Sequence, residues 1–80
     1  MPDGLSSSRK HWRVLDALMK LSGGQPDVFH DFGRVAAALS LNGIELGMAL
    51  AELKRAGDVQ LTDDTVALTE VGITHALLGP

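Results

Sequence analysis

The sequence predicts a small, mainly helical domain of the α+β class. Apolar residues recur at helical spacing between Trp12 and Ala56, and they alternate with polar residues between Val59 and Leu68, where a hairpin is expected. Helical spacing returns after Thr69. A chain of 80 residues forms one hydrophobic core, because domains of this size bury about 60% of their unfolded surface. We expect a single domain over residues 8–80, preceded by a flexible tail over residues 1–7.

The composition excludes several classes of protein. Hydrophobic residues make up 45% of the chain and charged residues 21%, which is typical of a globular domain. The chain contains no cysteine, so disulfides, thiolate nucleophiles and cysteine-ligated zinc are excluded. No apolar run is long enough for a membrane span, and the N-terminus lacks the apolar segment of a signal peptide. These features predict a cytoplasmic protein that does not enter a membrane.

The charges are unevenly distributed along the chain. The net charge of −3 argues against a large nucleic-acid surface, since lysines and arginines supply most nonspecific affinity for phosphate. Basic residues cluster near the start, at Arg9, Lys10 and Arg13. Acidic residues follow the central segment, at Asp58, Asp63, Asp64 and Glu70. A phosphate-facing surface would therefore draw on the first part of the chain.

Two helices are predicted before the central segment. The first runs from Ser8 to Leu21 and is capped by Ser7 or Ser8. The loop SGGQP follows, and the apolar pair Val28 and Phe29 predicts a brief strand. Asp31 is placed to cap a second helix, which ends by Ser40. The residues on its apolar side are Phe32, Val35, Ala36 and Leu39.

The stretch NGIELGMALAELKRAG predicts the best-defined helix of the chain. Asn42 is a favourable N-cap, and Glu45 completes a capping box with it. Gly57 ends the helix, after Lys54 and Arg55 in the last turn. The residues expected to face the core are Leu46, Ala49, Leu50, Leu53 and Ala56. The opposite stripe comprises Ile44, Met48, Ala51 and Arg55, flanked by Gly47 and Glu52.

The connections between these segments predict the topology. Ser40 to Gly43 is a tight turn between two helices, which is the arrangement of a helix-turn-helix. Two short strands are expected on either side of the pair Asp63 and Asp64. Thr69 can then cap a last short helix, EVGITHALL.

This pattern resembles the winged helix-turn-helix domain of bacterial transcriptional regulators. The run AAALSLNG is similar to that family's turn, and LAELKRAGDV to the end of its recognition helix, where Leu50, Leu53, Gly57 and Val59 match. VALTEVG is similar to the element that follows the wing. The resemblance covers Ser8 to Leu78. It implies a three-helix core, a two-stranded wing and a short C-terminal helix.

The resemblance implies a small regulator that binds double-stranded DNA. The helix from Gly43 to Ala56 would enter the major groove, with the hairpin from Val59 to Leu68 as the wing. The positions that would read bases are Ile44, Glu45, Gly47, Met48 and Ala51. Lys54 and Arg55 would contact phosphate or simply complement the helix dipole. Further candidates for phosphate contact, or for ordinary solvation, are Arg9, Lys10, Arg13 and Arg34.

The expected recognition surface departs from the family pattern in its chemistry. None of the base-reading positions carries arginine, lysine, asparagine or glutamine, and the wing tip carries Asp63 and Asp64. Gly47 costs helix stability, which suggests that something approaches closely. The alternative is a protein-interaction module whose apolar stripe of Ile44, Gly47 and Met48 docks a partner helix or a second copy. A further alternative is that the N-terminal tail or the last helix covers the stripe.

The sequence does not predict an enzyme. His11, His30 and His75 lack the spacing of metal ligands, and no phosphate-binding loop, cofactor motif or nucleophile with a partner base is present. Trp12 is expected to anchor the core. The last helix is apolar on several sides, so a homodimer formed through it is also expected.

Overall fold

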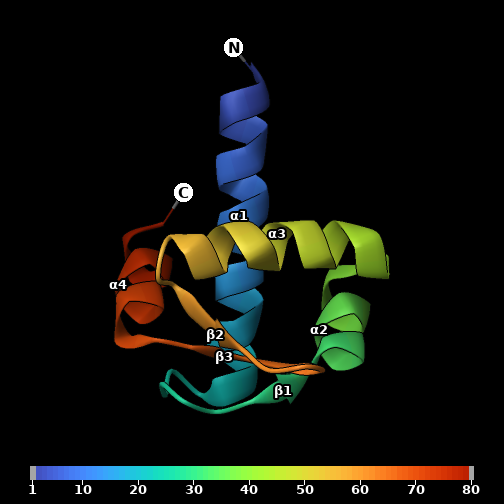
Figure 1. Ribbon diagram of the computed structural model, residues 1–80. Helices are drawn as coiled ribbons and strands as arrows, with labels where there is room; N and C mark the ends of the chain where they lie inside the picture. Colours follow the sequence, from blue (N-terminus) through green and yellow to red (C-terminus); the bar gives the residue numbers. More distant parts are fainter. Residues whose placement is uncertain (1, 80) are drawn as a thin grey trace.

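The computed structural model describes the backbone of residues 2–79 and the side chains of residues 10–79. Within this part of the chain it contains four helices and a three-stranded antiparallel sheet, so the predicted mainly helical α+β class is confirmed. The elements (Figure 1) are α1 (Pro2–Ser22), β1 (His30–Asp31), α2 (Phe32–Leu39), α3 (Gly43–Arg55), β2 (Val59–Leu61), β3 (Thr65–Leu68) and α4 (Glu70–Leu78).

The helix α1 is the central support of the fold. Figure 1 shows it passing behind α3, with α2 and α4 on either side and the sheet at the base. The core contains Val14 and Leu18 from α1, both fully buried. The other buried hydrophobic residues that complete this cluster are Leu15, Val35, Leu39, Leu46, Ala49, Leu50, Leu53, Val59, Val66, Leu68 and Ala76. Among residues 2–79 no single helix is long and apolar enough to cross a membrane.

The start of α1 differs from the prediction. The helix begins at Pro2 and runs through Ser7 and Ser8, so neither serine is its cap. Proline fits the first turn of a helix, because its fixed φ is helical and its missing N–H would have no partner there. Figure 1 shows this early part of α1 extending beyond α3. The side chains of residues 1–9 lie outside the described residues.

The sheet has one strand more than the predicted two-stranded wing. Its order is β1-β3-β2, and β1 pairs antiparallel with β3 through His30 and Val66. The brief strand is therefore not formed by Val28 and Phe29, whose side chains are 37% and 44% exposed. The strand forms two residues further on because that register pairs β1 with the free edge of β3, whose Val66 is fully buried.

The helix α2 has the predicted bounds but not the predicted cap. Asp31 stands at the N-cap position with extended backbone, yet its side chain makes no capping hydrogen bond. The first backbone N–H of the helix, that of Phe32, instead donates to the carbonyl oxygen of Asp64 at 3.0 Å. The turn between β2 and β3 thus docks at the N-terminus of α2. This contact satisfies one of the donors that a helix start leaves free.

A short turn sets the angle between α2 and α3. Ser40 adopts a left-handed conformation with φ 57° and ψ 38°, which ends α2. The N–H of Leu41 donates to the carbonyl oxygen of Ala36 at 3.0 Å. The direction of the chain changes by 106° between α2 and α3. This bend presents one long side of α3 to solvent.

The caps predicted for α3 are confirmed. The N–H of Glu45 donates to Oδ1 of Asn42 at 2.8 Å, and the N–H of Asn42 donates to Oε1 of Glu45 at 3.3 Å. Gly57 follows the helix with φ 85°. The inner residues are buried as predicted except Ala56, which is exposed. It stands at the C-cap, after the last helical residue Arg55, and so has left the buried face.

The last helix, α4, packs against α1 and β3. The hydroxyl of Thr69 accepts from the N–H of Gly72 at 3.1 Å, which confirms the predicted cap. Nε1 of Trp12 donates to the carbonyl oxygen of Ala76 at 2.9 Å. Trp12 is half-buried and lies outside the buried core cluster, so it holds α4 against α1 instead of anchoring the core as predicted.

Candidate functional site on the outer face of α3

The residues Ile44, Gly47, Met48 and Ala51 form one exposed surface, which we call the α3 face. The capped helix places them opposite the buried Leu46 and Leu50. Ile44 is 77% exposed and Met48 is 69% exposed. Two large apolar side chains exposed to this degree on one side of a helix form an apolar surface patch, which is informative in a way that a single exposed residue is not.

Neither the start of the chain nor its last helix covers this surface in the described part of the chain. The helix α4 packs against α1 and β3, and α1 runs past α3 on the inner side (Figure 1). A Cβ built on Gly47 would have no heavy atom within 4 Å beyond its own helix. The alternative of intramolecular cover is therefore wrong for the described residues.

Two hollows border the α3 face. One lies between α1 and α3, has a volume of about 580 Å³, and is lined by Lys10, His11, Glu45, Met48, Ala49, Ala51 and Glu52. The other lies between α2 and α3 and has a volume of about 260 Å³. Its lining is apolar and rich in glycine, and consists of Phe32, Gly33, Ala36, Gly43, Leu46, Gly47 and Leu50. The apolar character of the α3 face thus continues toward α2, while polar residues border it toward α1.

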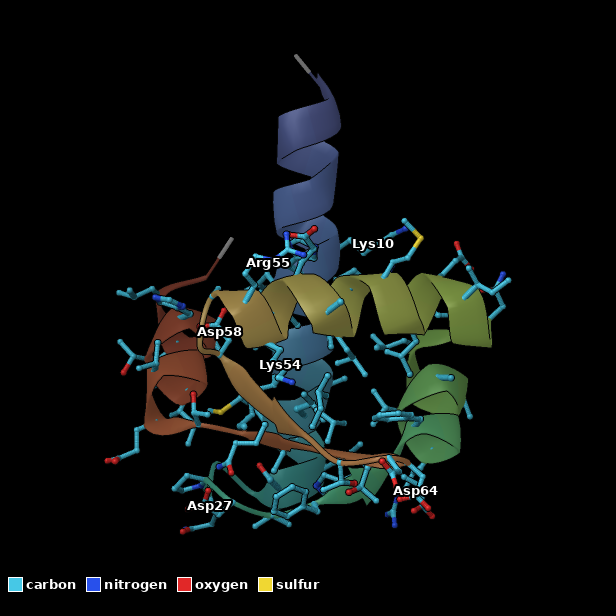
Figure 2. The ribbon with its side chains drawn as sticks, in the orientation of Figure 1. Lys10, Asp27, Lys54, Arg55, Asp58 and Asp64 are labelled. Atoms are coloured by element: carbon cyan, nitrogen blue, oxygen red, sulfur yellow. The ribbon has the colours of Figure 1, made fainter. Side chains whose placement is uncertain are left out.

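The charges beside the α3 face are balanced by close partners. Nζ of Lys10 lies 4.0 Å from Oε2 of Glu45, and Nη1 of Arg55 lies 3.5 Å from Oε1 of Glu52. Figure 2 shows Lys10 and Arg55 on one side of α3, whereas Lys54 lies on the other side. The cations predicted to contact phosphate therefore do not form one continuous basic edge along the helix.

The remaining basic candidates lie on other parts of the surface. Arg13 borders a hollow between α1 and α2, together with Asp16 and Lys20, which are themselves joined by an ion pair of 3.0 Å. Arg34 is exposed on α2. The side chain of Arg9 lies outside the described residues. Of the predicted site residues, the structure brings together Lys10 and those of α3 except Lys54, which lies on the other side of the helix.

The hairpin turn does not extend a positive surface beside α3. Asp63 and Asp64 are exposed at the turn, and Asp64 docks at the start of α2 (Figure 2). The contact is made by the backbone carbonyl oxygen of Asp64, so the carboxylates of both residues stay at the exposed turn. The same carboxylates would repel a phosphate backbone.

Comparison with protein-family models, with curated proteins and with solved structures finds no match to this chain. The assignment of a function therefore depends on the chemistry of its own surfaces.

The structure also shows a polar pair that the sequence did not predict. Oδ1 of Asp58 lies 2.6 Å from Nδ1 of His75, and Asp58 is the one charged residue among the described ones that is fully buried. A hollow of about 380 Å³ beside this pair is lined by residues that include His11, Trp12 and Glu52. No residue in the lining is a serine, threonine or cysteine nucleophile. Within residues 2–79, no group of three or more metal-ligating side chains is placed to hold an ion.

This pair joins two elements and supports no catalytic assignment. His75 is separated from Asp58 by β2, β3 and the start of α4, so no local spacing signals their contact. One local feature could have suggested this contact. Asp58 follows the glycine that ends α3 and precedes a strand, so its backbone is expected to be fixed.

Proposed function

We propose that this chain is a winged helix-turn-helix domain that acts as a protein-interaction module, with the α3 face as its docking surface. The bend of 106° between α2 and α3 supports the helix-turn-helix part, since helices in that motif meet at about 90–120°. The hairpin of β2 and β3 takes the place of the wing, and β1 adds a third strand to it.

The exposure of Ile44 and Met48 carries this proposal. Exposed apolar patches mark protein contacts more often than chance, because their burial is favourable. Burying one such side chain contributes about 1.5–3 kcal/mol. The adjoining hollow between α2 and α3 would extend the contact, since its lining is also apolar. The α3 face is therefore suited to an apolar partner surface.

The charges around α3 support a protein partner over DNA. Base edges are read mainly by arginine, lysine, asparagine and glutamine, none of which belongs to the α3 face. Glu45 and Glu52 border that face on the side of α1, and each lies near a cation that it neutralises. A phosphate backbone approaching here would meet no net positive charge, and affinity for DNA depends mainly on such charge.

The test compares Met48→Glu with a matched control, Ala37→Glu, which adds the same charge at an exposed position of α2. Both variants are assayed for protein binding, by affinity capture from the producing cells and by oligomeric state. We expect Met48→Glu to abolish binding and Ala37→Glu to retain it. Unchanged oligomeric state and unchanged capture in Met48→Glu would contradict the proposal.

A second candidate function is DNA binding by a small transcriptional regulator. It is favoured by the angle between α2 and α3 together with the unobstructed outer side of α3, which a recognition helix requires. Ile44 and Met48 would then contact thymine methyl groups, and Lys54 and Arg55 would contact phosphate. In a gel-shift assay with mixed duplex fragments at low salt, this candidate predicts a shift that weakens when Lys54 and Arg55 are replaced by alanine. The absence of any shift would contradict it.

A further inference from the structure

We propose that the partner of the α3 face is a second copy of this chain, with the two α3 helices packed antiparallel across a two-fold axis. This inference rests on the proposed function and names its partner. A two-fold interface places the same surface on both sides, so the surface must be complementary to itself. The order of residues along α3 meets this requirement in its shape and in its charges.

The apolar residues of α3 are complementary in size when the axis passes midway between Met48 and Ala51. Met48 then faces Ala51 of the second copy, so a long side chain meets a small one. Ile44 faces Arg55 of the second copy, whose aliphatic stem can cover it. Gly47, which has open space around its missing Cβ, allows the two backbones to approach. The exposed Ile44 and Met48 are thereby removed from water.

The charges are also complementary in this arrangement. Nη1 of Arg55 points toward Glu52, at 3.5 Å from its Oε1, and so toward the side of α3 that also carries Glu45. A two-fold axis brings these equivalent sides together, and the antiparallel order places Arg55 of one copy beside Glu45 of the other. Lys10 already lies 4.0 Å from Glu45. Each end of the interface then contains Lys10 and Arg55 against Glu45 and Glu52, with no net charge.

The size of the α3 face predicts a weak dimer. A helix of 13 residues is roughly 20 Å long. Its outer side alone falls short of the roughly 1,200–2,000 Å² that stable complexes bury in total. We therefore expect a reversible dimer with a Kd of about 10–100 μM, whose population depends on concentration.

The decisive experiment exchanges the charges at the two ends of α3. Arg55→Glu and Glu45→Arg are prepared separately, and their association is measured by sedimentation equilibrium, alone and mixed in equal amounts. Each variant alone places like charges opposite one another, whereas the mixed pair restores opposite charges at both ends. Circular dichroism confirms that each variant folds, since Glu45→Arg also removes half of the capping box.

We expect each variant alone to dimerise about tenfold more weakly than the natural chain, and the mixture to regain its affinity within about threefold. Lys20→Glu, which alters an ion pair on α1 away from α3, is the matched control and should leave dimerisation unchanged. A natural chain that stays monomeric up to about 1 mM, or a mixture that associates no better than its components, overturns the inference. If a different protein then binds through Met48, the proposed function stands, so the two failures are distinguishable.

Discussion

Nδ1 of His75 donates a hydrogen bond to Oδ1 of Asp58 at 2.6 Å, which joins α4 to the residue that precedes β2. The backbone of Asp58 takes part in the same joint, since its N–H donates to the carbonyl oxygen of Leu53 at 2.9 Å and its carbonyl oxygen accepts from Thr69 at 3.0 Å. The end of α3, the start of β2 and the start of α4 therefore meet at one residue. These contacts connect the C-terminal end of α3 to β2 and α4.

Removing the partner of Asp58 should destabilise the fold. In His75→Ala the buried carboxylate loses its hydrogen bond, which should lower the free energy of unfolding by about 1–3 kcal/mol. Asp63→Ala, in the exposed turn, is the control and should change it by less than about 0.5 kcal/mol. Urea denaturation followed by circular dichroism measures both. Equal effects in the two variants would contradict the structural role of the pair.

Two glycines should respond in opposite ways to alanine. A Cβ on Gly72 would lie 2.0 Å from the carbonyl oxygen of Asp58, so Gly72→Ala must displace α4 or the joint. We expect a loss of about 3 kcal/mol in the free energy of unfolding. Gly47→Ala meets open space on α3 and should raise stability by about 0.5–1 kcal/mol. Thermal denaturation of both variants tests these two predictions. A stabilised Gly72→Ala variant would contradict the close contact between Gly72 and the backbone of Asp58.

The residues at the two N-cap positions should contribute differently to the free energy of unfolding. Asn42 makes a complete capping box, so Asn42→Ala should lower the free energy of unfolding by about 1 kcal/mol. Asp31 makes no side-chain capping bond, so Asp31→Ala should be close to neutral. Denaturation midpoints at constant m-value provide the comparison. A larger loss at Asp31 than at Asn42 would reverse the assignment of the caps.

The indole N–H of Trp12 should contribute to the docking of α4. Trp12→Phe retains an aromatic ring but leaves the carbonyl oxygen of Ala76 without its donor. We expect the free energy of unfolding to fall by about 1 kcal/mol. Amide hydrogen exchange should also become faster in α4 than in α2. Uniform exchange rates across both helices would indicate that Trp12 does not hold α4.

Local signals in the sequence predicted the bounds of α2 and α4, and those of α3 except that this helix ends at Arg55 instead of Ala56. Asn42 with Glu45, Gly57 and Thr69 each act on their own turn of backbone, so their effect can be predicted without the rest of the fold. The hairpin was likewise predictable from the alternation between Val59 and Leu68. The outer residues of α3 followed from the helix, because its inner residues fixed which side faces the core.

Contacts between distant segments could not be predicted in the same way. The strand β1 exists because His30 pairs with Val66, and nothing near His30 shows this. The docking of Asp64 at the start of α2 depends on the same sheet. The contact of His75 with Asp58 requires the folded position of α4. The exposure of Ile44 and Met48 likewise depends on where α4 packs, which is against α1 and β3 and away from the outer side of α3.

The most direct test of the protein-binding role of the α3 face is photo-crosslinking in the producing cells. A photoreactive amino acid replaces Met48 in one variant and the exposed Ala37 of α2 in another. We predict a discrete protein adduct, of the chain with itself or with another protein, from position 48 and none from position 37. Adducts with DNA alone at position 48, or identical adducts from both positions, would contradict the protein-binding role of the α3 face.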